Sequence, residues 1–315
     1  MTKRRTTPFV ADDGTQIAIA RKRHPSRWII GAIALAFAAW VLSIVVFNPK
    51  IHWDEVGKYL FDERILSGIW VTILISIVAT VLGLLLGVVI AVMKLSHNPV
   101  LKWLAEGYIW FFRGTPVLVQ LIFWFNLAFL LPYITIQIPW TLIGYRWDTN
   151  VVIAGNTAAV LGLGLNLAAY FAETVRAGIL AVDAGQTEAA LAGGMTRGQA
   201  MRLVVLPQAL RIIIPPTANE FISMLKTTSL IIVVAGSDLM TEASKIYKQN
   251  NLIIELLIVA SIWYMVMTAI ATYFQSLLEK RFGKDRVRQM KPNSTQSRIL
   301  NLATGSIRLP SRQGK

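Results

Sequence analysis

Residues 65–93 read ILSGIWVTILISIVATVLGLLLGVVIAVM, which is 29 residues without a charged side chain. A helix rises about 1.5 Å per residue, so about 20 apolar residues cross the roughly 30 Å hydrocarbon core of a bilayer. The run is therefore long enough for a tilted span with an extra turn. It predicts a membrane-spanning helix, and with it a membrane protein.

The composition of the whole chain agrees with this prediction. Of its 315 residues 55% are hydrophobic and 15% are charged, and the mean hydropathy is +0.55. Soluble domains average about 45–50% apolar and about 25% charged residues. The chain has no cysteine, and its three histidines (His24, His52 and His97) lie outside the long apolar runs. These counts exclude disulfides, thiolate metal sites and a cysteine nucleophile, and we expect no metal or catalytic residue in the chain.

Five further apolar runs complete the expected fold, which is an all-α polytopic membrane protein with six transmembrane helices. The run 28–47 follows a basic cluster, but it is about twice too long for a signal peptide and no cleavage site follows it. Glu220 and Lys226 interrupt the fifth of the six spans. The five runs are 28–47, 115–131, 151–172, 217–236 and 256–278.

The distribution of basic residues predicts the orientation of these spans. With six spans, the two tails and two inner connections carry 22 Lys and Arg residues, whereas the opposite side carries 6. Cytoplasmic segments are enriched in Lys and Arg, so both termini are expected in the cytoplasm. The basic tails 1–27 and 283–315 are poor in apolar residues, and we expect them to be disordered and attracted to anionic lipid. A nucleic-acid partner is not expected, because the tails carry no supporting motif.

A patterned segment lies between the fourth and fifth spans, where residues 182–207 read VDAGQTEAALAGGMTRGQAMRLVVLP. We expect a short helix that Thr187 caps and that Gly193 and Gly194 end. Thr196 then caps a second helix over 197–205, and Pro207 begins another element. The segment predicts an elbow of two short helices, residues 183–207, on the cytoplasmic face.

The elbow carries the pattern Glu-Ala-Ala-x3-Gly-x9-Ile-x-Leu-Pro, with valine in place of the isoleucine. The pattern resembles the permease subunits of ATP-binding-cassette importers. Four flanking stretches resemble the polar amino acid branch of those permeases: RGTPVLVQ (113–120), YFAETVRAGI (170–179), DAGQ (183–186) and LKTTSL (225–230). The resemblance covers about residues 62–282, so the span 28–47 is an addition to a five-helix permease core. Related sequences often have an acidic residue after Asn166, where this chain has Leu167, so the substrate preference of close relatives within that branch is not carried over to this chain.

The resemblance implies import of polar amino acids or related compounds by alternating access, driven by ATP hydrolysis on a separate subunit and coupled through the elbow 183–207. It also implies the partners for this function. Cytoplasmic ATPase subunits would dock on the elbow, a second permease copy or paralogue would complete a dimer, and an extracytoplasmic binding protein would deliver the substrate. The chain has no phosphate-binding loop, so we expect it not to be an enzyme, with ATP and Mg held by the ATPase. The implied location is the plasma membrane of a bacterium, the inner membrane if it is Gram-negative. The residues expected to couple the elbow to the ATPase are Gln186, Glu188, Ala189, Ala190, Gly194, Leu206 and Pro207.

Polar residues inside the spans are the candidates for a substrate pathway, and hydrogen bonding between helices is their alternative role. A lipid-facing Lys226 would cost roughly 2.5–3.5 kcal/mol, so it is expected to face protein or water. Glu220 follows Pro215, Pro216 and Thr217, an arrangement that favours a capped helix start over a substrate or gating role. The candidates are Gln120, Asn166, Tyr170, Ser223, Lys226, Thr227, Thr228 and Ser229.

Three further expectations come from spacing and composition. Glu173 and Arg176 lie three residues apart, which predicts an ion pair on one helix face. Gly83 and Gly87 fit a close helix-packing motif. The aromatic outer loop 132–150 is expected to anchor at the membrane interface or to contact the binding protein. An importer permease for another small solute and a secondary transporter driven by an ion gradient stay open as alternatives.

Overall fold

The computed structural model describes residues 9–10, 16–17, 25–137 and 144–289. The chain divides into two compact units, Met1–Trp53 and Asp54–Lys315. In the first unit β1 (Phe9–Val10) pairs with β2 (Gln16–Ile17), and α1 (Pro25–Val46) contains the apolar stretch Trp28–Ile44. All of the predicted span 28–47 except Phe47 thus lies on one helix, while most of both tails lies outside the described residues.

Three helices of the second unit are long and apolar enough to cross a membrane: α3 (Glu63–Leu95), α8 (Gly155–Leu180) and α13 (Ile253–Gln289). They extend the predicted spans 65–93, 151–172 and 256–278 at one or both ends, and α13 continues into the segment expected to be a disordered tail. Two bent helix pairs also pass the length and composition test, so the described residues hold three to five candidate spans in addition to α1.

The predicted span 115–131 is wrong as a single helix. α4 (Pro99–Gly114) and α5 (Val117–Phe125) meet at a bend of 100°, and the short α6 (Leu127–Leu130) follows. Pro116 causes the bend between α4 and α5, because proline lacks an N–H and forces the residue before it out of the helical region. Thr115 accordingly has an extended backbone, with φ −111° and ψ 143°. Inside the predicted span, α5 ends at Phe125, and Asn126 separates it from α6.

The predicted helix start at Pro215 and Pro216 is also wrong, because both prolines lie inside α11 (Leu206–Thr227). Membrane helices tolerate internal proline where nearby hydroxyl groups and neighbouring helices satisfy the backbone. The Thr217 hydroxyl donates to the Ile213 carbonyl over 2.9 Å, so it does not form the expected cap with Glu220. The helix then narrows into the 3-10 turn η2 (Thr228–Val234).

Short elements connect the long helices and add a little sheet to a fold that is mostly helical, as expected. Within the outer loop, β3 (Tyr133–Gln137) pairs antiparallel with β4 (Gly144–Asp148). These strands are rich in Ile, Tyr, Trp and Thr, which favour a pleated strand over a helix. The remaining connecting helices are α2 (Trp53–Leu60), α7 (Thr149–Val152) and α12 (Leu239–Asn250).

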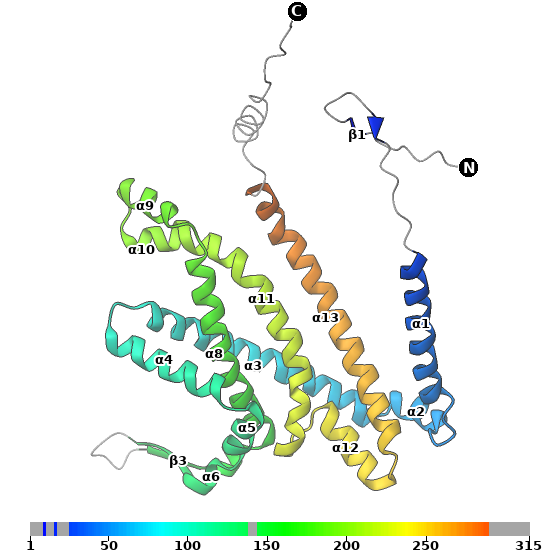
Figure 1. Cartoon of the computed structure of the whole chain (residues 1–315). Coiled ribbons are helices and arrows are strands. Elements are labelled where there is room, and N and C mark those ends of the chain that lie inside the picture. The colour runs from blue at the N-terminus through cyan, green and yellow to red at the C-terminus, as the bar shows by residue number, and fades with distance from the viewer. Residues whose placement is uncertain (1–8, 11–15, 18–24, 138–143, 290–315) are drawn as a thin grey trace, which may run out of the picture. The chain divides into compact units, whose positions relative to one another are not determined.

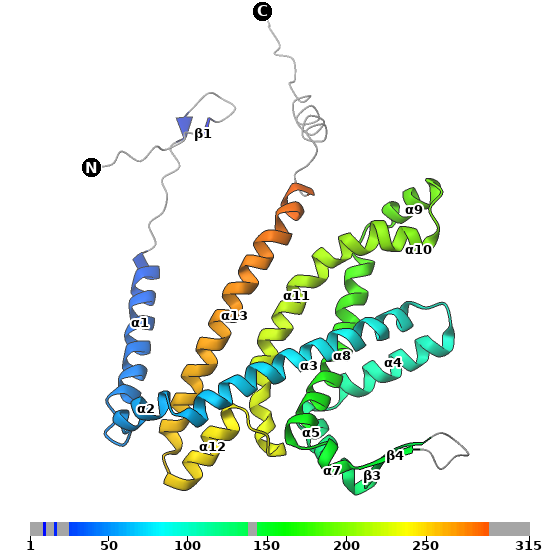
Figure 2. The same cartoon turned by 180° about the vertical axis from the view of Figure 1, so that it is seen from behind.

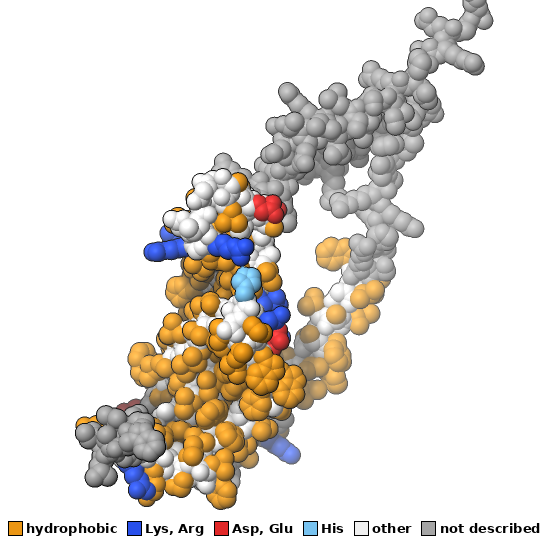
Figure 3. All heavy atoms as spheres, turned by 90° about the vertical axis from the view of Figure 1, so that its left-hand side faces the viewer, with side chains coloured by type: hydrophobic (Ala, Val, Ile, Leu, Met, Phe, Trp, Pro, Cys, Tyr) orange, Lys and Arg blue, Asp and Glu red, His pale blue; other side chains and the backbone are white. Residues whose placement is uncertain are grey.

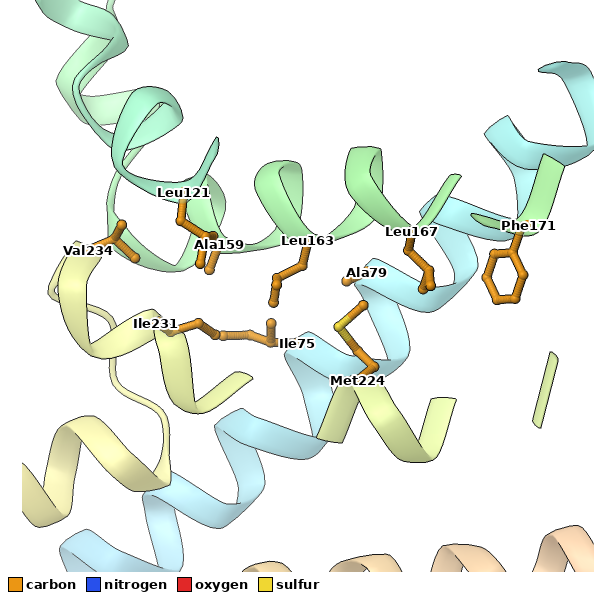
Figure 4. Packing of buried hydrophobic residues seen from close by; sticks show 10 residues of the cluster. All are labelled: Ile75, Ala79, Leu121, Ala159, Leu163, Leu167, Phe171, Met224, Ile231 and Val234. Atoms are coloured by element: carbon orange, nitrogen blue, oxygen red, sulfur yellow. The ribbon is translucent and has the colours of Figure 1, made fainter. Parts of the chain in front are cut away.

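The core of the second unit forms where α3 and α8 pack closely together. A Cβ atom on Gly87 would lie 2.6 Å from the Phe171 Cβ, and one on Gly83 would lie 3.1 Å from the Gly164 carbonyl oxygen. The expected packing role of Gly83 and Gly87 is therefore confirmed. Figure 4 shows how side chains of α3, α5, α8, α11 and η2 meet in this core: Ile75, Ala79, Leu121, Ala159, Leu163, Leu167, Phe171, Met224, Ile231 and Val234.

The elements of the elbow lie at the opposite end of the second unit from α12, as both ribbon views show (Figures 1 and 2). They are α9 (Ala184–Ala192), α10 (Arg197–Ala200) and the π-helical turn η1 (Met201–Val205). Hydrophobic side chains cover the middle of the face seen in Figure 3, and the visible Lys and Arg side chains lie toward its ends. This pattern matches a surface with an apolar belt in lipid and charged groups in water.

Candidate functional site

The first helix of the elbow begins earlier than expected. Its cap is Asp183, whose carboxylate accepts the Gly185 amide over 2.7 Å, so α9 starts at Ala184 and the prediction of a Thr187 cap is wrong. A carboxylate caps a helix at least as well as a threonine hydroxyl. The expected end is confirmed: Gly193 is the C-cap, and Gly194 has a φ of +84°, which glycine tolerates without strain.

The second helix of the elbow has the expected start but not the expected end. Thr196 and Gln199 form a reciprocal capping box, with bonds of 3.3 and 2.8 Å. The helix does not stop at Val205, because α10, η1, α11 and η2 form one continuous run that reaches Val234. Pro207 lies in the first turn of α11, directly after the wide π turn, and such turns accommodate a break in the regular ladder of hydrogen bonds. The elbow is therefore one short helix and the first turns of a long one.

The expected coupling residues lie on both arms of this elbow. Gln186 on α9 accepts a hydrogen bond from Gln208 on α11 over 3.4 Å, which joins the arms. Ala190 is buried between them, with 8% of its surface exposed. The Glu188 side chain is exposed and forms no ion pair within the described part of the chain. The remaining expected coupling residues are all exposed: Ala189, Gly194, Leu206 and Pro207. This surface of small side chains with one carboxylate can receive the backbone of another protein.

A cavity of about 460 Å³ lies at the bend between α4 and α5, and α8 and α11 form its other walls. Its floor includes Leu163, Leu167 and Met224 from the core shown in Figure 4. The lining residues are Arg113, Gly114, Thr115, Pro116, Val117, Leu163, Asn166, Leu167, Tyr170, Glu220, Ser223, Met224 and Thr227.

Two amides stabilise the bend beside this cavity. The Gln120 amide donates to the Phe112 and Thr115 carbonyls over 3.0 and 3.2 Å and to the Thr115 hydroxyl over 2.7 Å. The Asn166 amide on α8 donates to the same Phe112 carbonyl over 2.8 Å and to Gln120 Oε1 over 3.2 Å. The amides thus satisfy carbonyls at the end of α4, which has no further helical turn to supply donors.

Two opposite charges face the same cavity. The Arg113 guanidinium lies over the Tyr170 ring, 5.1 Å from its centroid. Glu220 reaches the cavity from α11. Neither side chain has an ion-pair partner among the residues that the structure describes. A site with a free guanidinium and a free carboxylate can bind a molecule that carries a carboxylate and an ammonium group.

The structure brings together part of the predicted pathway. Asn166, Tyr170, Ser223 and Thr227 line the cavity, and Gln120 bonds to its wall. Three other candidates are absent from the lining. The hydroxyl groups of Thr228 and Ser229 donate to the carbonyls of Leu225 and Lys226, each over 2.8 Å. Lys226 itself is exposed on α11 and forms no ion pair within the described residues.

Arg113 and Glu220 were missing from the predicted pathway for local reasons. The charge-free run begins two residues after Arg113, which placed the arginine at the boundary of a span. Glu220 follows two prolines and matches a helix cap. The sharp bend and the uninterrupted α11 bring both side chains to the cavity, and neither feature follows from counting apolar residues. The unpaired charge in the fifth apolar run was the available signal for Glu220.

The expected ion pair between Glu173 and Arg176 is confirmed, with the Arg176 Nε and Nη2 atoms 3.0 and 2.8 Å from Glu173 Oε2. Sequence spacing did not indicate a third member. Lys94, at the end of α3, donates to Glu173 Oε1 over 2.5 Å.

Comparison with known proteins identifies the family of this arrangement. Residues 83–284 match the family described as binding-protein-dependent transport system inner membrane component. The chain is 44% identical to the arginine transport system permease protein ArgU of Corynebacterium glutamicum, over 90% of this chain and 88% of that one. It is 34% identical to the probable glutamine ABC transporter permease protein GlnM of Bacillus subtilis, over 75% of this chain and 99% of that one.

Solved structures agree with these relatives. The crystal structure of an amino acid ABC transporter with histidines matches with a TM-score of 0.63 and 36% identity, over 74% of this chain and 99% of that one. The inward-facing MetNI methionine ABC transporter shares the fold at a TM-score of 0.52 and 18% identity, over 68% of this chain and 96% of that one. The resemblance seen in the elbow and its flanking stretches is confirmed. The chain belongs to the family of binding-protein-dependent transport system inner membrane components, the permease subunits of ABC importers.

Proposed function

We propose that this chain is the permease subunit of an ATP-driven importer for polar amino acids, and that its substrate passes through the cavity between α4, α5, α8 and α11. The observation that carries the proposal is the pair Arg113 and Glu220, two opposite charges at one cavity without ion-pair partners among the described residues. Arg113 would bind the carboxylate of the amino acid, and Glu220 would bind an ammonium or other cationic group. Relatives named as arginine and glutamine permeases support the substrate class.

The topology that we propose has six spans, with α1 added to the five of the permease core and both termini in the cytoplasm. The three to five candidate spans of the described residues and the apolar stretch in α1 support this number. The excess of basic residues in the tails and inner connections supports the orientation. The bacterial plasma membrane, or the inner membrane of a Gram-negative cell, is the corresponding location.

The proposed partners divide the work of transport. Cytoplasmic ATPase subunits hold ATP and Mg and dock on the elbow, while the permease chain carries no cofactor and no catalytic residue. A binding protein delivers substrate at the opposite face. Closure of the ATPase pair moves the elbow and switches the pathway between inward-facing and outward-facing states.

A second permease copy or a paralogue completes the proposed pathway. Lys226 supports pairing with a second subunit, because it is exposed on a spanning helix and has no ion-pair partner within the described residues. A lysine that faces lipid near the middle of the membrane costs roughly 2.5–3.5 kcal/mol. The charge would face protein or water if a second subunit covered it.

The experiment that tests the function is uptake of radiolabelled arginine into proteoliposomes that hold the permease, its ATPase and its binding protein. We expect uptake that requires ATP, and we expect Glu188→Lys to abolish it and to weaken co-purification of the ATPase. Glu106→Lys is the matched control, since it makes the same charge change at an exposed position of α4 outside the elbow. Unchanged uptake with Glu188→Lys would contradict coupling through the elbow. Competition by unlabelled lysine, glutamine and glutamate then ranks the substrates.

A further inference from the structure

Three charged side chains meet where the ends of α3 and α8 lie together, on the elbow side of the second unit. Both oxygens of the Glu173 carboxylate accept hydrogen bonds from these cations. Oε1 accepts from Lys94 on α3 over 2.5 Å, and Oε2 accepts from Arg176 on α8 over 2.8 Å. The side chains of Lys94 and Glu173 are 21% and 19% exposed, so water screens this contact only in part. The Lys94 bond crosses between helices, whereas the Arg176 bond stays within α8.

The contact between α3 and α8 is otherwise apolar and close. Gly87 and Phe171 approach so closely that a Cβ atom on the glycine would lie 2.6 Å from the phenylalanine Cβ. Apolar packing of this kind sets the separation of two helices, but it is not directional. A charge-assisted hydrogen bond has a preferred direction and length. The bond from Lys94 to Glu173 therefore fixes how the two helices are turned and shifted relative to each other.

Glu173 lies on α8 between the cavity and the elbow. Tyr170, about one turn away, lines the cavity and contacts Arg113 of α4. Toward its C-terminus α8 ends at Leu180, and Asp183 is already the N-cap of α9. Only three residues therefore connect α8 to the elbow, and Glu173 lies on α8 between this connection and the residues that line the cavity.

We propose that Glu173 is a positioning residue that locks α3 to α8 through Lys94, so that the two helices move as one body when the elbow moves. The inference rests on the proposed function, because a moving elbow is part of that function. The lock has one essential bond, between helices. The bond to Arg176 orients the carboxylate and is dispensable for the lock.

The two cations of the cluster supply a matched pair of variants. Lys94→Met removes the bond between helices and keeps a long apolar side chain, while Arg176→Met removes the bond within α8. If the cluster were only a local stabiliser of α8, Arg176→Met would have the larger effect. The lock predicts the opposite order. Lys94→Arg and Glu173→Asp keep both charges and test whether charge alone is sufficient.

Distance measurements test the lock directly, and the chain contains no cysteine, so the introduced cysteines are its only labelling sites. Val92 on α3 and Leu180 on α8 are each 60% exposed. Spin labels on Val92→Cys and Leu180→Cys, measured by pulsed electron spin resonance in lipid nanodiscs, report the separation of the helix ends. We expect a narrow distribution for the parent, Arg176→Met and Lys94→Arg, and a broad one for Lys94→Met. An equally narrow distribution for Lys94→Met, with a normal elution profile, would overturn the proposal.

A second measurement uses the complete importer with ATP and radiolabelled arginine. The labelled parent is expected to keep one distance between the two labels in the nucleotide-free and vanadate-trapped states, since α3 and α8 move as one body, and a distance that changes would overturn the lock.

Stimulation of ATP hydrolysis by the loaded binding protein is expected to fall about fivefold in Lys94→Met, while basal hydrolysis and assembly stay unchanged. Failure of the parent to take up arginine with ATP would instead count against the proposed function, which the distances in the isolated permease do not require. If Lys94→Met does not fold, Glu173→Leu replaces it, because it removes the carboxylate that Lys94 binds; a broad distribution in this variant supports the lock and a narrow one overturns it.

Discussion

The charged side chains near α8 form two groups, and only one of them consists of ion pairs. At the elbow end of the helix, Glu173 is bonded by Lys94 and Arg176, and both of its oxygens are occupied. At the cavity, Arg113 and Glu220 have no ion-pair partners among the described residues. Removing one partner of a buried charge pair is costly, because the other charge is left uncompensated. Paired charges therefore suit a fixed contact, whereas free charges are available to a ligand that comes and goes.

The packing also differs between the two groups: it is close around the paired charges and open around the unpaired ones. Along the contact of α3 with α8, glycines leave no room for a side chain. At the cavity α4 and α5 are separated by a sharp bend, and a Cβ on Gly114 would meet no atom within 4 Å. Substitutions in the packed contact should therefore change the stability of the fold, while substitutions at the cavity should change transport.

The largest effect is expected from Gly87→Leu in the packed contact. The new side chain would collide with Phe171, and overpacking of this severity costs about 3 kcal/mol or more. Thermal unfolding of the purified permease in detergent measures the loss. Gly107→Leu is the matched control, because Gly107 of α4 has no atom within 4 Å of a Cβ position. Equal melting temperatures for the two variants would remove the contrast between the regions.

Next in size is the effect of Glu220→Gln at the cavity. A hydrogen bond to a charged group contributes about 1.5–3 kcal/mol, which corresponds to roughly a 10–100-fold loss of uptake efficiency. The melting temperature should stay within the error of the parent, because no described ion pair is broken. The assay is initial uptake of labelled arginine at several concentrations, with Glu63→Gln, at an exposed position of α3 without an ion pair among the described residues, as the control. A stability loss without a transport defect would show that Glu220 supports the fold instead.

A smaller effect is expected from Arg113→Lys, which keeps the charge but loses the planar contact with Tyr170. A cation–π contact at a partly exposed site contributes about 0.5–1 kcal/mol, or roughly two- to fivefold in uptake. Arg113→Ala removes the charge as well and should reduce uptake further. Parent-like uptake by Arg113→Ala would exclude this arginine from substrate binding.

The smallest effect is expected from Lys102→Met on α4. Lys102 Nζ lies 4.0 Å from Glu106 Oε1, and the two side chains are 57% and 48% exposed. Such surface pairs contribute about 0–1 kcal/mol, so the melting temperature should hardly change. Lys94→Met, made in the same detergent, should lower it measurably more. A reversed order would mean that burial does not set the strength of these pairs.

The long helices could be predicted from the sequence, because an apolar run of sufficient length has few alternatives in a protein of this composition. The bends could not be predicted in the same way. Pro116 breaks a helix while Pro215 and Pro216 lie within one. The difference depends on whether neighbouring groups satisfy the freed carbonyls, and that is a property of the folded molecule.

The residues of the candidate site could likewise be predicted from the sequence only in part. Asn166, Tyr170, Ser223 and Thr227 stand out as polar residues in apolar runs, and all four line the cavity. Arg113 lies outside such a run, and only the bend carries it to the cavity. The long-range bond from Lys94 to Glu173 joins residues far apart in the chain, and helical spacing gives information only about partners three or four residues apart.

The uninterrupted helix from Arg197 to Val234 gives the permease a lever arm. Its first turn belongs to the elbow, and Thr227 lines the cavity, so at 1.5 Å per residue about 45 Å of one rod separates the two positions. If such a rod pivots at one end, a tilt of about 5° displaces the other by about 4 Å over this length. Pro215 and Pro216 lie near its middle, where the lack of two N–H donors removes backbone hydrogen bonds and makes bending easiest. In the proposed mechanism, the stiffness of this helix would set how much of a displacement of the elbow arrives at the cavity.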